Sequence, residues 1–166
     1  QELTEKTRLP LLRQTGSLIE SPAGYLHLTA QENLEIVADL KGVPHKDIGR
    51  VLDIVHLTQD RNRRVGQYSL GMKQRLGIAM ALLGSPKLLI LDEPTNHLDI
   101  MSKEILEDAL NGYEGTILYV SHDRYFINHT AHRILDLTEG QFVSYVGNYD
   151  YYLEKHDTVM AAIEAS

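Results

Sequence analysis

The hydrophobic positions between residues 30 and 83 recur every three or four residues, which is the spacing of amphipathic helices. Thr29 and Glu32 form a capping-box pattern, in which each side chain accepts a hydrogen bond from the other residue's amide at the start of a helix. Gly42 is a typical residue for the end of that helix. We therefore expect a helical segment with helices over 30–41, 44–55 and 69–83.

Shorter apolar runs on both sides of this segment predict β-strands, because each run is bounded by turn-forming residues. The expected strands cover 11–20, 87–92 and 116–122, and residues 133–146 are expected to form a hairpin that turns at Glu139 and Gly140. Further helices are predicted over 100–110, around 123–130 and from Tyr149 onward. Strands that alternate with helices indicate a parallel α/β sheet, in which the segment 30–83 would be a helical insert.

Composition narrows the class of protein. The chain has 166 residues, 43% of them hydrophobic and 23% charged, which is an ordinary balance for one globular domain. It contains no cysteine, so disulfides and thiolate metal sites are excluded. Residues 1–86 carry 11 basic against 9 acidic residues, whereas residues 87–166 carry 5 against 14. The acidic second half is a poor surface for nucleic acid, and we expect no direct DNA binding.

Two adjacent acids end the apolar run at residues 87–92, where the sequence reads KLLILDEPTNHLD. In a parallel sheet, ligands bind at the carboxyl ends of the strands, and Asp92, Glu93 and His122 all fall at such ends. Asp92 could hold Mg²⁺, which prefers oxygen ligands, while Glu93 could orient or deprotonate a water molecule. The alternative, that both acids merely belong to a surface loop, fits the run of buried strand residues less well.

These residues resemble motifs of the ATP-binding-cassette (ABC) ATPases. The stretch LLILDEPTNHLD is similar to the Walker B strand, the catalytic glutamate and the D-loop of that family, and VSHD is similar to its switch-histidine segment. The resemblance implies that Asp92 serves Mg²⁺, that Glu93 polarises the attacking water and that His122 contacts the γ-phosphate of ATP. It also makes Asp99 the last residue of the D-loop.

The sequence YSLGMKQRLGIAMAL resembles the signature loop and helix of the same family. Ser69 and Gly71 match the signature serine and second glycine, which implies that they bind phosphate at a helix N-terminus. Leu70 and Met72 depart from the family's usual Leu-Ser-Gly-Gly-Gln. Leu70 places a side chain where the family usually has none, so the approach of phosphate is expected to change.

The two parts of the chain resemble different branches of the family. Residues 1–95 are similar to bacteriocin and lantibiotic exporter ATPases, and Glu20 stands where most members have the Q-loop glutamine. Residues 96–155 are similar to ABC-F proteins, which carry paired cassettes and act on ribosomes or in antibiotic resistance. A natural intermediate, a chimera and an engineered chain are equally open explanations.

None of the twelve glycines begins a Gly-x4-Gly-Lys-Ser/Thr phosphate loop, the Walker A motif. We therefore expect an incomplete P-loop NTPase fold of the ABC ATPase type, in which the P-loop strand is missing between the strands at 116–121 and 133–138. The unpaired edges predict an oligomer, a partner chain or marginal stability. The expected domains are a partial α/β core (1–21 and 86–148), a helical subdomain (22–85) and a C-terminal helix that begins a linker (149–166).

The function implied by the resemblance is binding and hydrolysis of ATP with Mg²⁺ between two cassettes. Without Walker A, the isolated chain is expected to be weak or inactive, and whether it is an enzyme by itself stays open. The alternative is a non-enzymatic half-cassette that supplies its signature face to a P-loop-bearing partner. A membrane permease subunit or a ribosome would be a further partner, and the expected location is cytoplasmic, or peripheral at a membrane through a partner. A third hypothesis is a zinc site at His122, His129 and His132 with Asp123 or Asp136 as a further ligand, but scattered surface histidines account for the same pattern better.

Overall fold

The computed structural model describes residues 5–19, 24–138 and 140–164. Its contacts divide the chain into two compact units, residues 1–120 and residues 121–166, which are described separately. The first unit contains a three-stranded parallel sheet with the order β1 (Thr15–Leu18), β2 (Leu88–Asp92) and β3 (Thr116–Val120). Between β1 and β2 the described residues form helices, turns and one isolated β-bridge between Thr29 and Arg64, and they add no strand to this sheet. The predicted parallel sheet with a helical insert is therefore confirmed.

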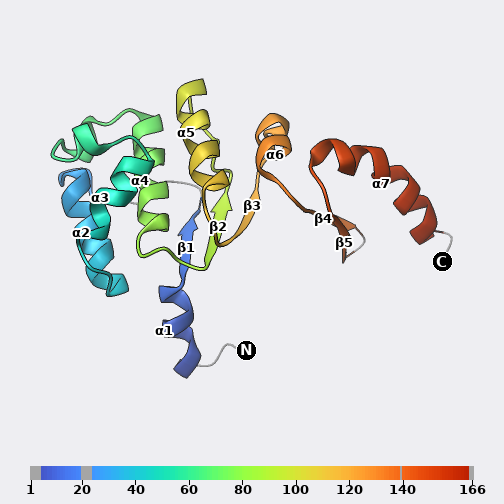
Figure 1. Cartoon of the computed structure of the whole chain (residues 1–166), viewed down its shortest axis with the longest axis horizontal. Helices are drawn as coiled ribbons and strands as arrows, with labels where there is room; N and C mark the ends of the chain where they lie inside the picture. The colour runs from blue at the N-terminus through green and yellow to red at the C-terminus, as the bar shows by residue number, and fades with distance from the viewer. Residues whose placement is uncertain (1–4, 20–23, 139, 165–166) are drawn as a thin grey trace. The chain divides into compact units, whose positions relative to one another are not determined.

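The helical insert consists of α2 (Ala30–Lys41), α3 (Asp47–Ile54) and α4 (Leu70–Leu82), with two short 3₁₀ turns at Thr58–Asp60 and Val65–Gln67. Figure 1 shows the three helices together beside the sheet, with α4 next to β1. The predicted capping box of Thr29 and Glu32 is present at the start of α2, and Gly42 ends that helix in a left-handed conformation with φ of 68°. These local signals explain why the helix boundaries agree with the sequence.

The ends of two helices are joined by a lysine. Lys41, in the last turn of α2, donates hydrogen bonds to the carbonyl oxygens of Met80 (3.0 Å), Ala81 (3.4 Å) and Leu83 (3.3 Å) at the end of α4. These carbonyls lack helical partners, and a cation there interacts favourably with the helix dipole. Burial lowers the pKa of Lys41 below its ordinary value.

One face of the parallel sheet is covered and the other is more open. Leu89 and Leu91 are buried on the face that packs against α4, together with Gly16 and Leu18 of β1. On the opposite face, Leu118 of β3 is 50% exposed, although leucine is a typical core residue. Helix α5 (Ile100–Asn111) follows β2 and contacts α4. Asp92, the last residue of β2, therefore comes from a strand that is buried on one side.

The beginning of the chain corrects one prediction. Residues 11–20 were expected to form a strand, but residues 11–13 belong to α1 (Glu5–Arg13) and only Thr15–Leu18 are extended. Leucine and arginine have high helix propensity, so the run of leucines before residue 13 favours a helix despite its partly alternating pattern. The helix was missed because the apolar run gave no clear helical period.

The second unit contains α6 (Arg124–Thr130), the antiparallel pair β4 (Ile134–Thr138) and β5 (Gln141–Tyr145), and α7 (Tyr149–Glu164). The predicted hairpin is confirmed on both sides of residue 139, which lies outside the described residues. Phe126 is fully buried, and Tyr145 packs edge-on against Tyr152 with ring centroids 5.0 Å apart. Asn128 and Asp150 exchange two hydrogen bonds that join α6 to α7.

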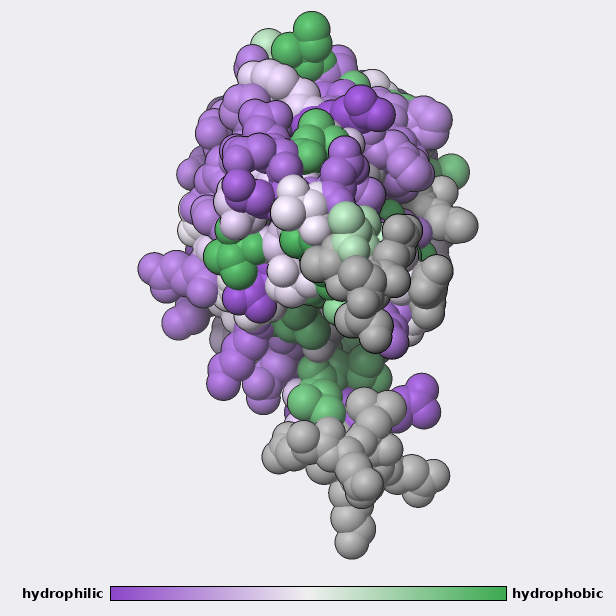
Figure 2. Space-filling model, turned by 90° about the vertical axis from the view of Figure 1, so that its right-hand side faces the viewer, coloured by the Kyte–Doolittle hydropathy of each residue, from purple (hydrophilic) through white to green (hydrophobic). Residues whose placement is uncertain are grey.

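Strands β3 and β4 belong to different sheets, and no described strand pairs with the second edge of either one. Apolar side chains also reach the surface of the β4–β5 hairpin, where Leu137 is 62% and Phe142 is 72% exposed. Figure 2 shows hydrophobic side chains in several separate spots on a mostly hydrophilic face of the molecule. The predicted domain boundaries near residues 22, 85 and 148 stay predictions.

Candidate functional site

The candidate site begins at the carboxyl end of β2. Asp92 pairs in register with Val120 of β3, and the amide of Glu93 donates a hydrogen bond of 2.9 Å to the Val120 carbonyl. Both acidic side chains are half-buried. The strand thus delivers two carboxylates to the edge of the sheet where parallel α/β folds bind ligands.

The segment from Glu93 to Asp99, called the acid loop here, reverses the chain through tight turns. Glu93 has φ of 45° and His97 has φ of 62°, which are left-handed conformations that side-chain-bearing residues rarely adopt. The amide of Asn96 donates to the carbonyl of Glu93 at 3.0 Å, and Thr95 is 95% buried. The conformation of Glu93 costs about 1–2 kcal/mol and must be held by surrounding contacts.

Asp99 ends the acid loop and begins α5. Its carboxylate accepts a hydrogen bond of 2.7 Å from the amide of Ser102, which is an ordinary helix N-cap. Hydrogen bonds from the side chain and then the backbone of Ser102 lower the pKa of Asp99 below its usual value. The structure therefore gives Asp99 a local structural role; its predicted role toward a nucleotide stays a prediction.

The predicted signature residues lie at the start of α4. Ser69 is the N-cap, and its hydroxyl accepts a hydrogen bond of 3.2 Å from the amide of Met72. Leu70 is 50% exposed, as expected for a side chain at the open end of the helix. Gly71 is instead buried: a Cβ at this position would lie 3.2 Å from the hydroxyl oxygen of Ser102. The absence of a side chain at Gly71 thus allows close packing of α4 on α5, besides any role toward phosphate.

A buried glutamine that the sequence did not single out joins α4 to the acid loop. Gln74 is 97% buried, and its Nε2 donates to the carbonyl oxygen of Pro94 at 3.5 Å. In the sequence it is the middle one of three consecutive polar residues, Lys73 to Arg75, in a mostly apolar helix, and periodicity gives no sign that its side chain faces another segment. Ser102 was missed for the same reason.

His122 is exposed and belongs to the second unit, two residues beyond β3. It precedes Asp123, which caps α6 by accepting a hydrogen bond of 3.1 Å from the amide of Phe126. The acids of β2 lie in the first unit, so the expected cooperation of His122 with Asp92 and Glu93 stays a prediction. Glu20, the predicted Q-loop residue, lies outside the described residues.

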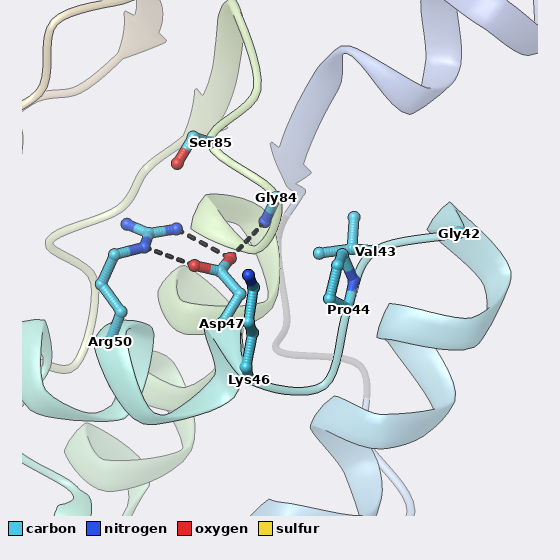
Figure 3. A pocket seen from close by; sticks show the side chains of 8 residues that line it. All are labelled: Gly42, Val43, Pro44, Lys46, Asp47, Arg50, Gly84 and Ser85. Carbon is cyan, nitrogen blue, oxygen red and sulfur yellow. Dashed lines mark hydrogen bonds and ion pairs between the residues drawn. The ribbon is translucent and has the colours of Figure 1, made fainter.

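An open hollow of about 510 Å³ lies elsewhere, between the α2–α3 connection and the end of α4 (Figure 3). Asp47 occupies its wall: its carboxylate accepts hydrogen bonds from the guanidinium of Arg50 and from the amide of Gly84 at 2.7 Å. These groups, Arg50 first, lower the pKa of Asp47. No predicted site residue lines this hollow, so it is separate from the acids of β2.

Within the described part of the chain, no group of three or more histidine, aspartate, glutamate or cysteine side chains could hold a metal ion. The zinc reading of His122, His129 and His132 therefore gains no support. A magnesium site needs fewer protein ligands, because Mg²⁺ is commonly held by one or two carboxylates together with substrate phosphates and water. The half-buried carboxylate of Asp92 fits that requirement. None of the described helices is long and apolar enough to cross a membrane.

Comparison with known proteins agrees with these observations. A family model described as ABC transporter matches residues 1–96. The chain is 48% identical over 122 residues to the putative ATP-binding protein YdiF of Bacillus subtilis; the matched region covers 73% of this chain and 19% of YdiF. It is 42% identical over 135 residues to the lantibiotic transport ATP-binding protein SrtF of Streptococcus pyogenes, covering 80% of this chain and 59% of SrtF.

A third relative, ABC transporter F family member 5 of Arabidopsis thaliana, is 50% identical over 95 residues, or 57% of this chain and 14% of that protein. The chain thus spans less than two thirds of the length of each of these relatives. A solved structure of an ATP-binding subunit of an ABC transporter superposes with a TM-score of 0.75 at 24% identity, over 92% of this chain and 66% of that one. This likeness confirms the predicted mixed α/β fold of the ABC ATPase type.

Proposed function

Because this chain belongs to the ABC transporter family, we propose that it forms part of a cassette that binds and hydrolyses ATP. The observation that carries the proposal is the arrangement at the end of β2, where a strand covered on one face delivers Asp92 and Glu93 to the edge of a parallel sheet. Nucleotides bind at this edge in α/β folds. The chain resembles both exporter ATPases and ABC-F proteins, and both resemblances support binding and hydrolysis of ATP.

The proposed roles follow from side-chain chemistry. Asp92 supplies an oxygen ligand for Mg²⁺, which when bound would offset the negative charge of the phosphates. Glu93 accepts a hydrogen bond from the attacking water and orients it. His122 would donate a hydrogen bond to the γ-phosphate, and Glu20, by its match to the Q-loop position, would supply a further oxygen ligand near Mg²⁺. Asp99 completes the D-loop at the cassette interface.

The start of α4 has a different proposed ligand, the nucleotide held by a second cassette. Ser69 and Gly71 stand at the N-terminus of a thirteen-residue helix, where amide groups point outward and the helix dipole favours anions. Ser69 is exposed, so its hydroxyl is accessible to a partner. The exposed Leu70 narrows that approach, and we expect weaker phosphate binding than a glycine there would allow.

The phosphate loop, which residues 1–166 do not contain, is proposed to come from another segment or from a partner chain. The second edges of β3 and β4, which no described strand pairs, support this view because such edges readily accept a further strand. A membrane permease subunit, as for a lantibiotic transport protein, or a ribosome, as for ABC-F proteins, remains a proposed second partner. In either assembly the chain would work in the cytoplasm.

The test is ATP hydrolysis by the purified chain, alone and mixed with a segment of a relative that carries a Gly-x4-Gly-Lys-Ser/Thr loop. We expect activity only in the mixture, and a loss of about 100-fold or more in kcat when Glu93 is changed to Gln, which is typical for removal of a general base. The matched control is Glu104→Gln, which neutralises an exposed acid on α5. Equal losses in both variants would contradict the proposed role of Glu93.

A second candidate function, a non-enzymatic half-cassette, makes a different prediction in the same assay. In that case the chain stimulates hydrolysis by a P-loop-bearing partner through Ser69, and Glu93→Gln has no effect. The exposed N-terminus of α4 is the observation that favours this alternative. The response to Glu93→Gln therefore separates the two functions.

A further inference from the structure

The first turns of α4 contact the acid loop of the same chain. A Cβ on Gly71 would lie 3.2 Å from the hydroxyl oxygen of Ser102 and 4.0 Å from Cδ2 of Leu98. The start of the signature helix therefore lies directly on the end of the acid loop and the first turn of α5. Contacts at this distance leave no room for water between the two segments.

One helical turn further, Gln74 reaches the other end of the acid loop. Its side chain is 97% buried, and its Nε2 donates to the carbonyl oxygen of Pro94, the residue directly after Glu93. The separation of 3.5 Å makes this a long hydrogen bond. Loss of this hydrogen bond is nevertheless costly in free energy, because the amide and the carbonyl are both buried and neither can form a hydrogen bond with water instead.

The backbone of Glu93 is held from two sides. Its amide is bound to β3 through the Val120 carbonyl at 2.9 Å, and the next residue, Pro94, is bound to α4 through Gln74. Between these two attachments Glu93 keeps the left-handed conformation with φ of 45°. A conformation of this kind persists only where neighbouring contacts impose it.

The same turn of α4 is also tied to α3. Arg75 donates from Nη1 to the carbonyl oxygens of Val55 at 3.0 Å and His56 at 3.2 Å, at the end of α3. Gln74 and Arg75 are neighbours but bind different partners, the acid loop and the end of α3. A displacement of the helical insert would therefore reach the backbone next to Glu93 through one turn of α4.

We propose that Gln74 is a positioning residue that couples the helical insert to the acid loop and holds the backbone of Glu93 in place. The proposal rests on the proposed function for the chemical role of Glu93, but the coupling itself is a property of this chain alone. Gln74 touches neither water nor phosphate in this scheme and acts only through Pro94.

The coupling is tested by amide hydrogen exchange on the full chain without nucleotide. Gln74→Met keeps a side chain of similar length and removes the donor, and Lys73→Met is the matched control on the neighbouring, half-buried position of α4. We expect exchange at Asn96 and Leu98, whose amides bond within the acid loop, to rise about 10-fold or more in Gln74→Met. Exchange at these amides in Lys73→Met, and in the α2 helix of both variants, is expected to stay within about 2-fold of the unchanged chain.

If amide exchange in Gln74→Met rises equally throughout the first unit, the role of Gln74 is purely structural. If exchange in the acid loop does not rise, there is no coupling. Either result overturns the proposal. If Gln74→Met fails to fold, the unchanged chain gives the answer by NMR. The Nε2 protons of Gln74 are then expected to exchange slowly, and rapid exchange with solvent would overturn the proposal.

A second measurement separates this proposal from the proposed function. In the mixture with a P-loop-bearing segment, Gln74→Met is expected to lower kcat while KM for ATP stays unchanged, because the residue positions Glu93 and does not bind ATP. An absence of ATPase activity in the mixture would contradict the proposed function and leave the exchange result intact. A changed KM with unchanged kcat would overturn the positioning role.

Discussion

Gly16 in β1 lies where the backbone of α4 closely approaches the covered face of the sheet. A Cβ added there would lie 2.1 Å from the carbonyl oxygen of Ala81 in α4 and 2.7 Å from Cδ2 of Leu89 in β2. Atoms of this kind pack at about 3.5 Å, so Gly16→Ala must push the strand and the helix apart by about 1.4 Å. The backbone of α4 cannot rotate away as a side chain could.

The expected effect of Gly16→Ala on the free energy of unfolding follows from two opposing contributions. Overpacking of a core contact costs about 1–3 kcal/mol, and the restricted unfolded chain of alanine returns about 0.4–1 kcal/mol. Since the obstacle is backbone, we take the upper half of the first range and expect Gly16→Ala to lower the free energy of unfolding by about 2 kcal/mol. Gly49→Ala is the control: Gly49 lies within α3, nothing is within 4 Å of its Cβ position, and alanine should stabilise that helix by up to about 1 kcal/mol.

Urea unfolding followed by circular dichroism measures both variants. The midpoint is expected to fall for Gly16→Ala and to rise for Gly49→Ala, with the slope of the transition unchanged in each. An unchanged or raised midpoint for Gly16→Ala would show that α4 does not approach β1 as closely as described. Because both variants replace a glycine by alanine in the same chain, the difference between them reports the close contact at Gly16 and not the general effect of that replacement.

Two further predictions concern the helical insert and the second unit. The pKa of Asp47 is lowered in the folded chain, so its ion pair with Arg50 contributes stability above the ordinary pKa of 3.8 and loses it as pH falls through the lower folded value. Asp47→Asn should therefore destabilise the chain at neutral pH and flatten the acid limb of the stability profile, as measured by urea unfolding from pH 7 to pH 2. Phe126 is fully buried in α6, so Phe126→Ala should cost about 3–5 kcal/mol and raise amide exchange in α7, whereas the exposed Tyr125→Ala should change little.

Local signals in the sequence predicted most of the fold. The helices that follow Thr29, Ser69 and Asp99 were predicted, and each of these residues accepts the capping hydrogen bond that its position requires. Each signal acts within four residues, so the sequence alone contains the information. The helix α1 was missed because its leucine-rich run shows neither a helical period nor a cap that would separate it from a strand.

The contacts of Gln74 and Gly71 could not be predicted in the same way. Each depends on the distance between α4 and a segment twenty or more residues away, which is set only when the helical insert packs on the sheet. The resemblance to the signature motif predicts that Gly71 binds phosphate, and the structure shows that Gly71 also packs closely against Ser102. Only the three-dimensional arrangement could reveal that second demand.

The first turn of α4 thus meets two requirements at once. Its exposed side carries Ser69 and Leu70 toward any partner, while its buried side carries Gly71 against Ser102 and, one turn on, Gln74 against Pro94. A ligand that binds the exposed side would displace the helix slightly. Because a helix moves as a rigid unit, that displacement would reach the segments packed against its buried side. Since the buried side packs on the loop that carries Glu93, a nucleotide bound at Ser69 and the water oriented by Glu93 would be linked through a single turn of helix.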